Sequence, residues 1–316
     1  MGKASRTKVD ATRREKIAAQ RAAERRTEQR RRILIASGSI VAVVAIVVAF
    51  IVIKANNKPG SSTSSNGPTG SSLASVVSNV TSVPASTLDK IGSGSGQVTS
   101  KPATISGGTA LTANGKPEML YMGAVYCPYC AAERWAMIVA LSRFGTFSGL
   151  ATTHSASVNG AGQAEPYPNT PTWTFHNASF TSQYLTFTPK EMYTNIPTSS
   201  GGYTTLDTLT SDQSAIFAKL DAPPYVQSAS DDESYPFVNF GNQYVIVGAS
   251  YNPQTLDGLG WATIANDLSK PASSVAKAVG GTANYMTAAL CKLTNNQPST
   301  ACTSTVTGLQ SKLQAP

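Results

Sequence analysis

The chain has 316 residues, of which 41% are hydrophobic and only 13% are charged, with a formal net charge of +8. This length and composition allow one sizeable core with appendages, or two small domains. Residues 1–32 hold twelve Lys or Arg against four acids, a net of +8, and the other 284 residues carry 13 charges of each sign. The excess charge therefore belongs to one tail and does not indicate a nucleic-acid-binding domain, so we expect no nucleic-acid partner.

An uncharged apolar run of 21 residues, Ile33 to Ile53, follows this tail. At about 1.5 Å per residue it is long enough to cross a hydrocarbon core of about 30 Å. A cleaved signal peptide is the alternative, but its apolar core is typically about 7 to 15 residues and a small-residue cleavage site should follow. The sequence therefore predicts a transmembrane helix over 33–53.

The charges that flank this span set its expected orientation. Twelve Lys or Arg precede it, and only Lys54 and Lys58 follow it closely. Positive charges next to a span stay in the cytoplasm. We therefore expect residues 1–32 to be a cytoplasmic basic tail in contact with anionic membrane lipid, and the bulk of the chain to lie outside the cell membrane.

Residues 54–97 are rich in Ser, Gly, Thr, Asn and Pro. Such a stretch has few apolar groups to offset the entropy of ordering it, so we expect a flexible stalk. A short helix within residues 73–91 is an alternative for part of it. From about Val98 the pattern becomes that of a folded domain, which we expect to occupy residues 98–316.

Two cysteines three residues apart lie at a predicted junction between a strand and a helix. The continuous apolar run at 119–126 is typical of a central strand covered on both faces. The residues after it have the apolar spacing of a helix that ends near Gly145. The sequence "CPYC" therefore places Cys127 at a helix N-terminus and Cys130 one turn further in.

The remaining segments predict more strands and helices. Gly241-Asn242 joins two apolar strands and is typical of a hairpin turn. We expect strands or extended segments at 149–158, 172–180 and 184–189, a helix opened by Thr or Asp at 205–222, and two closing helices, around 252–268 and 281–293.

The position of the cysteine pair favours redox chemistry. The helix dipole and the unpaired amides at a helix N-terminus stabilise a thiolate, the reactive form of cysteine. A zinc site would need two more ligands, and the other two cysteines are eleven residues apart. A purely structural Cys127–Cys130 bond closes too short a loop to stabilise the fold much. Both alternatives stay open, but we expect no metal and no cofactor.

The order of these features resembles the thioredoxin superfamily: an apolar strand, "CPYC", a helix, then an X-Pro that opens a hairpin, and a closing helix. The resemblance covers about residues 117–268. It implies a mixed α/β sheet flanked by helices, with Pro236 as a cis-proline that faces the cysteines and Tyr235 before it as part of the substrate surface. Tyr121 stands about where thioredoxins place a buried acid.

Three residues are expected to modulate the cysteine pair. Pro128 takes the first helical position, where its missing N–H costs nothing. Tyr129 lies between the cysteines. Glu133, in the same first turns, should oppose the thiolate by its negative charge, so we expect a moderately acidic thiol.

The whole chain is similar to a membrane-anchored family known as domain of unknown function 929. This resemblance is carried by the anchor, the stalk, "GAVYCPYCAAERWAMIVALSRFG" and "PNTPTWTFHNASFTSQYLTFTPKE". The family name supplies no activity. The segment of about 146–234 exceeds a minimal crossover, so we expect a largely extended insertion there.

Cys291 and Cys302 enclose a polar loop after the last predicted helix. Their best interpretation is a structural disulfide worth about 3 kcal/mol. Such a bond persists in an oxidising compartment, which agrees with export.

Several other residues are weaker candidates for functional sites. His154 and His176 are interpreted as surface or strand residues, because spacing places no acid beside either. Asn79 and Asn177 match glycosylation acceptors. The acidic residues Asp231, Asp232 and Glu233 could lie at the mouth of the substrate groove.

The sequence thus predicts a membrane-anchored thiol:disulfide oxidoreductase that acts on exported cysteine-containing proteins and is regenerated by a membrane redox partner. Cys127 would be the attacking or attacked sulfur, and Cys130 the resolving thiol. The alternative is a non-catalytic binding module of the cell envelope. A reductant fed by a membrane electron carrier would share the fold and differ in direction.

Overall fold

The chain divides into two units, Met1–Phe50 and Ile51–Pro316, and the described residues all belong to the second. The expected basic tail (1–32) and span (33–53) lie outside the residues that the structure describes. Within the described ranges, no helix is both long and apolar enough to cross a membrane. A computed structural model describes residues 67–158, 162–199, 201–226 and 234–313.

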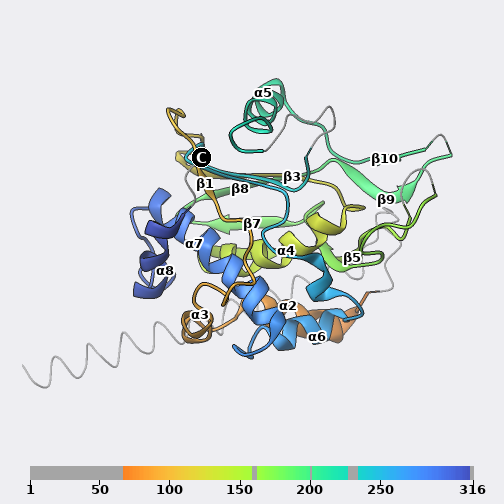
Figure 1. Cartoon of the computed structure of the whole chain (residues 1–316), viewed down its shortest axis with the longest axis horizontal. Helices are drawn as coiled ribbons and strands as arrows, with labels where there is room; N and C mark the ends of the chain where they lie inside the picture. The colour runs from red at the N-terminus through yellow and green to blue at the C-terminus, as the bar shows by residue number, and fades with distance from the viewer. Residues whose placement is uncertain (1–66, 159–161, 200, 227–233, 314–316) are drawn as a thin grey trace, which may run out of the picture. The chain divides into compact units, whose positions relative to one another are not determined.

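The second unit is built on a mixed sheet whose centre is the strand that precedes the cysteines (Figure 1). This strand, β3, pairs in parallel with β8 and antiparallel with β11 and β2, and β12 joins β11 to β1. The bounds are β1 Ala103–Thr104, β2 Thr112–Ala113, β3 Lys116–Gly123, β8 Thr186–Glu191, β11 Phe237–Phe240 and β12 Tyr244–Val247. The predicted central strand is thus confirmed.

Helices flank both faces of this sheet. Alternate residues of β3 point to opposite faces, as in any strand. Met119 and Tyr121 join the large apolar cluster under α4 and α7, whereas Leu120 and Met122 join a smaller cluster with α5. Figure 1 accordingly draws α5 on one side of the sheet and α4 and α7 on the other. The helices are α2 Gly70–Thr81, α3 Ala85–Ile91, α4 Pro128–Leu141, α5 Ser211–Leu220, α6 Trp261–Asp267, α7 Gly281–Leu293 and α8 Ser304–Leu309.

The expected flexible stalk does not extend through α2 and α3. The buried apolar residues Val76, Val77 and Val80 of α2, and Leu88 and Ile91 of α3, belong to the large core cluster. The Ser-rich composition suggested a linker, but these apolar residues repeat at helical spacing and give each helix one buried side. The folded domain therefore begins before the expected boundary at Val98.

The region expected as an insertion, 146–234, is largely extended where it is described. Its six outer strands form three antiparallel pairs, β4 with β7, β5 with β6 and β9 with β10. One part of the region is not inserted, because β8 lies beside β3 in the central sheet. The bounds are β4 Gly145–Ser148, β5 Ala151–His154, β6 Pro171–Thr174, β7 Ser179–Ser182, β9 Tyr193–Pro197 and β10 Tyr203–Thr205.

Several local predictions are confirmed. Thr210 caps α5 in a reciprocal arrangement with Gln213. Gly241 and Asn242 form the hairpin turn with φ of 62° and 54°, the left-handed values that a tight hairpin requires. Cys291 and Cys302 form a disulfide with their Cα atoms 5.7 Å apart.

The C-terminal end differs from the expected two helices. The first is split into a 3₁₀ turn, Pro253–Leu256, and α6, while α7 is preceded by a π-helical turn, Ala276–Gly280. The helix α8 was not expected and is followed by a turn at Gln310–Lys312.

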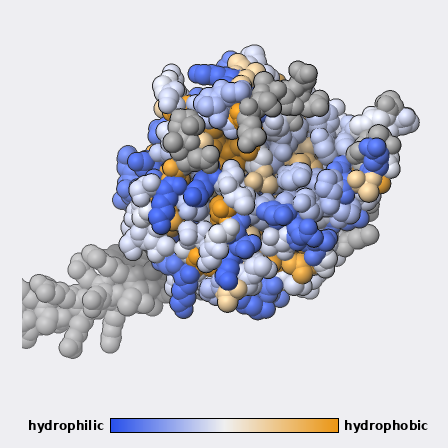
Figure 2. Space-filling view, in the orientation of Figure 1, coloured by the Kyte–Doolittle hydropathy of each residue, from blue (hydrophilic) through white to orange (hydrophobic). Residues whose placement is uncertain are grey.

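The view in Figure 2 shows a largely hydrophilic face with separate apolar spots rather than one broad apolar patch. Within the described ranges, Tyr129 is the one large apolar side chain that is exposed, at 39%.

Candidate functional site

Cys127 is the N-cap of α4. Its backbone is still extended, with φ of −72° and ψ of 122°, and Pro128 begins the helix as predicted. The Cys127 sulfur accepts a hydrogen bond from the backbone amide of Cys130 at 3.3 Å. A side chain in this position meets amides that have no partner within the helix, which favours a negative charge on it.

The two thiols have opposite environments. Burial alone raises the pKa of the Cys127 thiol, but donation from the Cys130 thiol and amide, the charge of Arg134 and the Tyr129 amide bring it below its ordinary value. Burial raises the pKa of Cys130 well above its ordinary value, and its position beside Cys127 raises it further. Cys127 is 7% exposed and Cys130 is fully buried. Cys127 is therefore the thiol that can ionise and be reached from outside.

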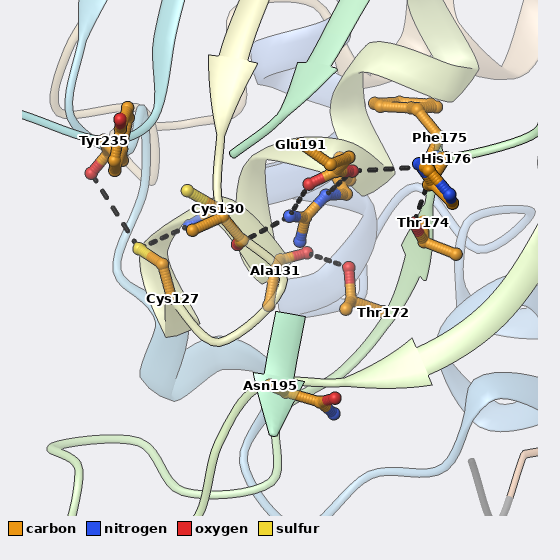
Figure 3. A network of polar contacts seen from close by, with 12 residues as sticks. Cys127, Cys130, Ala131, Thr172, Thr174, Phe175, His176, Glu191, Asn195 and Tyr235 are labelled. Carbon is orange, nitrogen blue, oxygen red and sulfur yellow. Dashed lines mark hydrogen bonds and ion pairs between the residues drawn. The ribbon is translucent and has the colours of Figure 1, made fainter. Parts of the chain in front are cut away.

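Tyr235 and Pro236, far away in sequence, lie beside this pair. The peptide bond between them is cis. The Cys127 thiol donates to the Tyr235 carbonyl oxygen across 3.9 Å, as the dashed line in Figure 3 shows. The Tyr235 ring stacks on Phe217 of α5, with ring centroids 5.9 Å apart. The structure thus brings together the two predicted catalytic cysteines and the two predicted substrate-binding residues, Tyr235 and Pro236.

A buried ion pair lies on the inner side of the cysteines. The guanidinium of Arg134 donates to both carboxylate oxygens of Glu191, at 2.9 and 2.7 Å, and also to the Ala124 carbonyl at 2.7 Å. Both side chains are fully buried. Although burial opposes its charge, Arg134 keeps a raised pKa because Glu191 faces it. Sequence reasoning missed this pair, since Glu191 follows Arg134 only after the long crossover.

Glu133 does not act as predicted. Its carboxylate is buried against Ser250, which donates from its amide at 2.8 Å and from its hydroxyl at 2.7 Å. Burial raises the pKa of Glu133 to about 7, although both donations lower it. The charged residue that acts on both cysteines is its neighbour, Arg134. Consecutive helix positions point about 100° apart, which separates the two roles.

Gly123 allows close packing behind Cys130. A Cβ at this position would overlap the Tyr121 hydroxyl and come within 3.1 Å of the Cys130 sulfur. The buried Tyr121 hydroxyl has no hydrogen-bond partner among the described residues. Tyr121 therefore fills the space behind the Cys130 thiol with a neutral side chain, since burial raises its pKa well above the ordinary value.

Comparison with protein families identifies the chain. The family model described as a domain of unknown function (DUF929) matches residues 102–292. The chain belongs to this family. No curated protein and no solved structure matches it.

The DUF929 match spans both cysteines of the pair, the ion pair and the hairpin, whereas α2, α3 and α8 lie outside it. The cysteine pair, the Arg134–Glu191 ion pair and the hairpin therefore all lie within the residues that match the DUF929 family model.

The two histidines of this DUF929 chain each have a local partner other than a cysteine. His154 Nδ1 contacts the Ser155 carbonyl at 2.8 Å. His176 lies 3.4 Å from a carboxylate oxygen of Asp207, a partner that spacing did not suggest. In the described part of the chain, no cluster of three or more His, Cys, Asp or Glu is arranged to hold a metal.

The remaining predicted residues are placed as follows. Asp231, Asp232 and Glu233 lie outside the described residues. Asn79 is exposed on α2 and donates to Asn266, and Asn177 is exposed in the turn between β6 and β7.

Proposed function

We propose that this chain is a thiol:disulfide oxidoreductase with a thioredoxin-like fold. The observation that carries the proposal is Cys127, a thiol with a lowered pKa at the N-cap of α4, beside a buried second thiol and the cis bond of Pro236. The strand arrangement supports the fold. The strand before the cysteines pairs in parallel with β8 and antiparallel with the strand that follows Pro236.

In the oxidising direction, a substrate thiolate attacks Cys127 in the Cys127–Cys130 disulfide. A bond forms between the substrate sulfur and Cys127, and Cys130 leaves as a thiolate that takes up a proton. A second substrate thiolate then attacks the bound substrate sulfur and releases Cys127 as a thiolate. The substrate loses two electrons and the protein gains them. Arg134 supports both departures, because its charge favours the ionised form of each cysteine.

We further propose that the protein is anchored by residues 33–53, with this domain outside the cell membrane. The 21-residue uncharged run and the basic tail before it support this location. The Cys291–Cys302 disulfide supports an oxidising compartment. The substrates would be exported proteins with cysteines, and a membrane redox partner would restore the resting state of the pair. The same chemistry run backwards is that of a reductase.

A non-catalytic binding module is the second candidate, and the small exposure of Cys127, 7%, favours it. Such a module would hold a partner at the same surface without exchanging disulfides.

Catalysis separates the two functions. The purified full-length chain, added to a peptide dithiol and glutathione disulfide, should accelerate formation of the peptide disulfide, and Cys127→Ala should abolish the acceleration. Cys130→Ala should accumulate peptide bound to Cys127, which dithiothreitol releases. A rate equal to that of Cys127→Ala would leave the binding module as the function.

The proposed location has its own test. Protease added to spheroplasts should degrade the domain beyond Lys54 and spare the tail. Protection of the domain would contradict the location.

A further inference from the structure

Four tyrosines lie near Cys127, and a fifth, Tyr167, contacts one of them. Tyr126 stacks on Tyr203, with ring centroids 4.1 Å apart and an interplanar angle of 8°, and lies 6.2 Å from Tyr193. Tyr129 meets Tyr167 edge to face at 5.9 Å. We call these five residues the tyrosine cluster. Three of them, Tyr167, Tyr193 and Tyr203, come from the long region between α4 and α5, which therefore supplies much of the surface around the sulfur.

A carboxylate lies within this cluster. Glu165 is half-buried, and one of its oxygens is 3.4 Å from the Tyr203 hydroxyl, which also donates to the Val158 carbonyl at 2.6 Å. Among the described residues, no cation pairs with Glu165. A carboxylate partly withdrawn from water gains more from a cation that arrives than one that is fully solvated.

Two groups that can carry negative charge, Cys127 and Glu165, lie beside the tyrosine cluster. Burial raises the pKa of Tyr129 and of Tyr203, and the negative charges of Cys127 and Glu165 raise both further. Arg134, whose positive charge acts on both cysteines, is fully buried and bound to Glu191. The outer surface thus combines aromatic faces, which attract cations, with a carboxylate that has no described counter-ion.

We propose that the tyrosine cluster and Glu165 bind a Lys or Arg side chain that lies next to the reacting cysteine of an extended substrate segment. The cation would lie against a tyrosine ring and pair with Glu165 while the substrate sulfur reaches Cys127. Arg and Lys are the side chains that combine such aromatic and carboxylate contacts. This proposal rests on the proposed oxidoreductase function. It adds the substrate class of the same site, which is segments with a Lys or Arg next to the reacting cysteine.

The test compares three peptides of equal length. Each holds one cysteine activated as an uncharged 2-pyridyl disulfide, and the cysteine is flanked on both sides by Lys, by Gln or by Glu. The reduced full-length chain attacks the peptide sulfur through Cys127 and releases 2-thiopyridone, whose absorbance gives the rate. Cys130 then attacks Cys127 and frees the peptide thiol, so that the protein is oxidised by two electrons and the probe is reduced by two.

We expect the Lys peptide to react roughly three- to tenfold faster than the Glu peptide, with the Gln peptide between them, and the ratio to fall as salt is added. Glu165→Gln, which keeps the acceptor for Tyr203, should lower the Lys-to-Glu ratio, and Tyr129→Leu should lower it as well. Asp257→Asn is the matched control. It removes one negative charge from an exposed position before α6 and should leave the ratio unchanged.

Each contrary outcome has a distinct meaning. Equal rates for the three peptides, or equal effects of Glu165→Gln and Asp257→Asn, would overturn the cation site and leave the oxidoreductase intact. A faster Gln peptide would point to an uncharged partner and would overturn the cation site too. Release no faster than in Cys127→Ala with every peptide would overturn the oxidoreductase function and the cation site together.

Discussion

Arg134 and Glu191 form a fully buried ion pair in which two guanidinium nitrogens meet the two carboxylate oxygens. The positive charge lies on the inner side of the cysteine pair. Burial raises the pKa of both thiols, and Arg134 acts against this effect at each of them. The ion pair therefore connects the end of β8 to the ionisation of the sulfurs.

Neutralising this ion pair should raise the pKa of Cys127. Arg134→Met alone leaves an unpaired buried carboxylate and should cost about 3 to 5 kcal/mol of stability. Arg134→Met combined with Glu191→Gln removes both charges and keeps an acceptor for the Phe175 amide. The pH dependence of alkylation by iodoacetamide reports the Cys127 pKa. Arg134→Lys, which retains the charge, should change it less. An unchanged profile in the double variant would show that Arg134 is structural.

The two thiols should differ in reactivity. After mild reduction, brief alkylation at neutral pH should label Cys127 on the order of tenfold more than Cys130, because Cys127 alone has a lowered pKa and some exposure. Mass mapping of the labelled peptides measures the ratio. Equal labelling, or faster labelling of Cys130, would reverse the assigned roles.

Glu133 should make stability depend on pH. Its pKa is about 7 in the folded chain against an ordinary value of 4.5, because burial disfavours the ionised form. Below about pH 4.5 both states are protonated; between about 4.5 and 7 only the unfolded state ionises, so stability falls as pH rises. The shift corresponds to about 3 kcal/mol, and above about pH 7 the loss is complete.

Urea unfolding of Glu133→Gln and of the wild type across this range tests the effect. Glu133→Gln should gain stability relative to the wild type as pH rises. Ser250→Ala removes a donor that favours the ionised form of Glu133 and should therefore raise the Glu133 pKa further. The loss of stability in this variant should then continue to higher pH than in the wild type. Parallel stability curves for the wild type and Glu133→Gln would exclude Glu133 as the cause.

The helices α2 and α3 should be required for folding. Their five buried apolar side chains would each contribute about 1.5 to 3 kcal/mol, a sum comparable to the whole stability of a domain. The Asn284 amide also donates to the Leu88 and Gly92 carbonyls, both at 2.8 Å. A chain that begins at Gly67 should unfold cooperatively on heating, and one that begins at Val98 should not. Equal melting temperatures would show that these helices are dispensable.

Local patterns predicted the elements whose determinants are local. The end of the strand and Pro128 fixed the position of Cys127, and Gly241-Asn242 fixed the hairpin. The pairing of Cys291 with Cys302 also followed from a short loop. In each case, the residues that decide the structure are close in sequence.

The contacts that were missed join distant segments. Arg134 meets Glu191, and His176 meets Asp207, only because the long crossover folds back on α4 and β8. The alternative of a short helix within residues 73–91 is confirmed by α2 and α3, but the burial of Val76, Val77 and Val80 in the core was not predicted. Burial of those residues depends on α6 and α4, which follow much later in the chain.

The central position of β3 bears on how Cys291 and Cys302 find each other during synthesis. Two strands that pair with β3, namely β8 and β11, are synthesised after it. Cys127 and Cys130 are therefore made while their surroundings are still incomplete. At that time Cys291 and Cys302 do not yet exist as competitors. An oxidant that acts on the growing chain therefore meets the first pair alone, and the last two cysteines, eleven residues apart, are left for each other. The order of emergence thus favours the Cys291–Cys302 disulfide over a bond from either of these residues to Cys127 or Cys130, which are both free thiols in the folded chain.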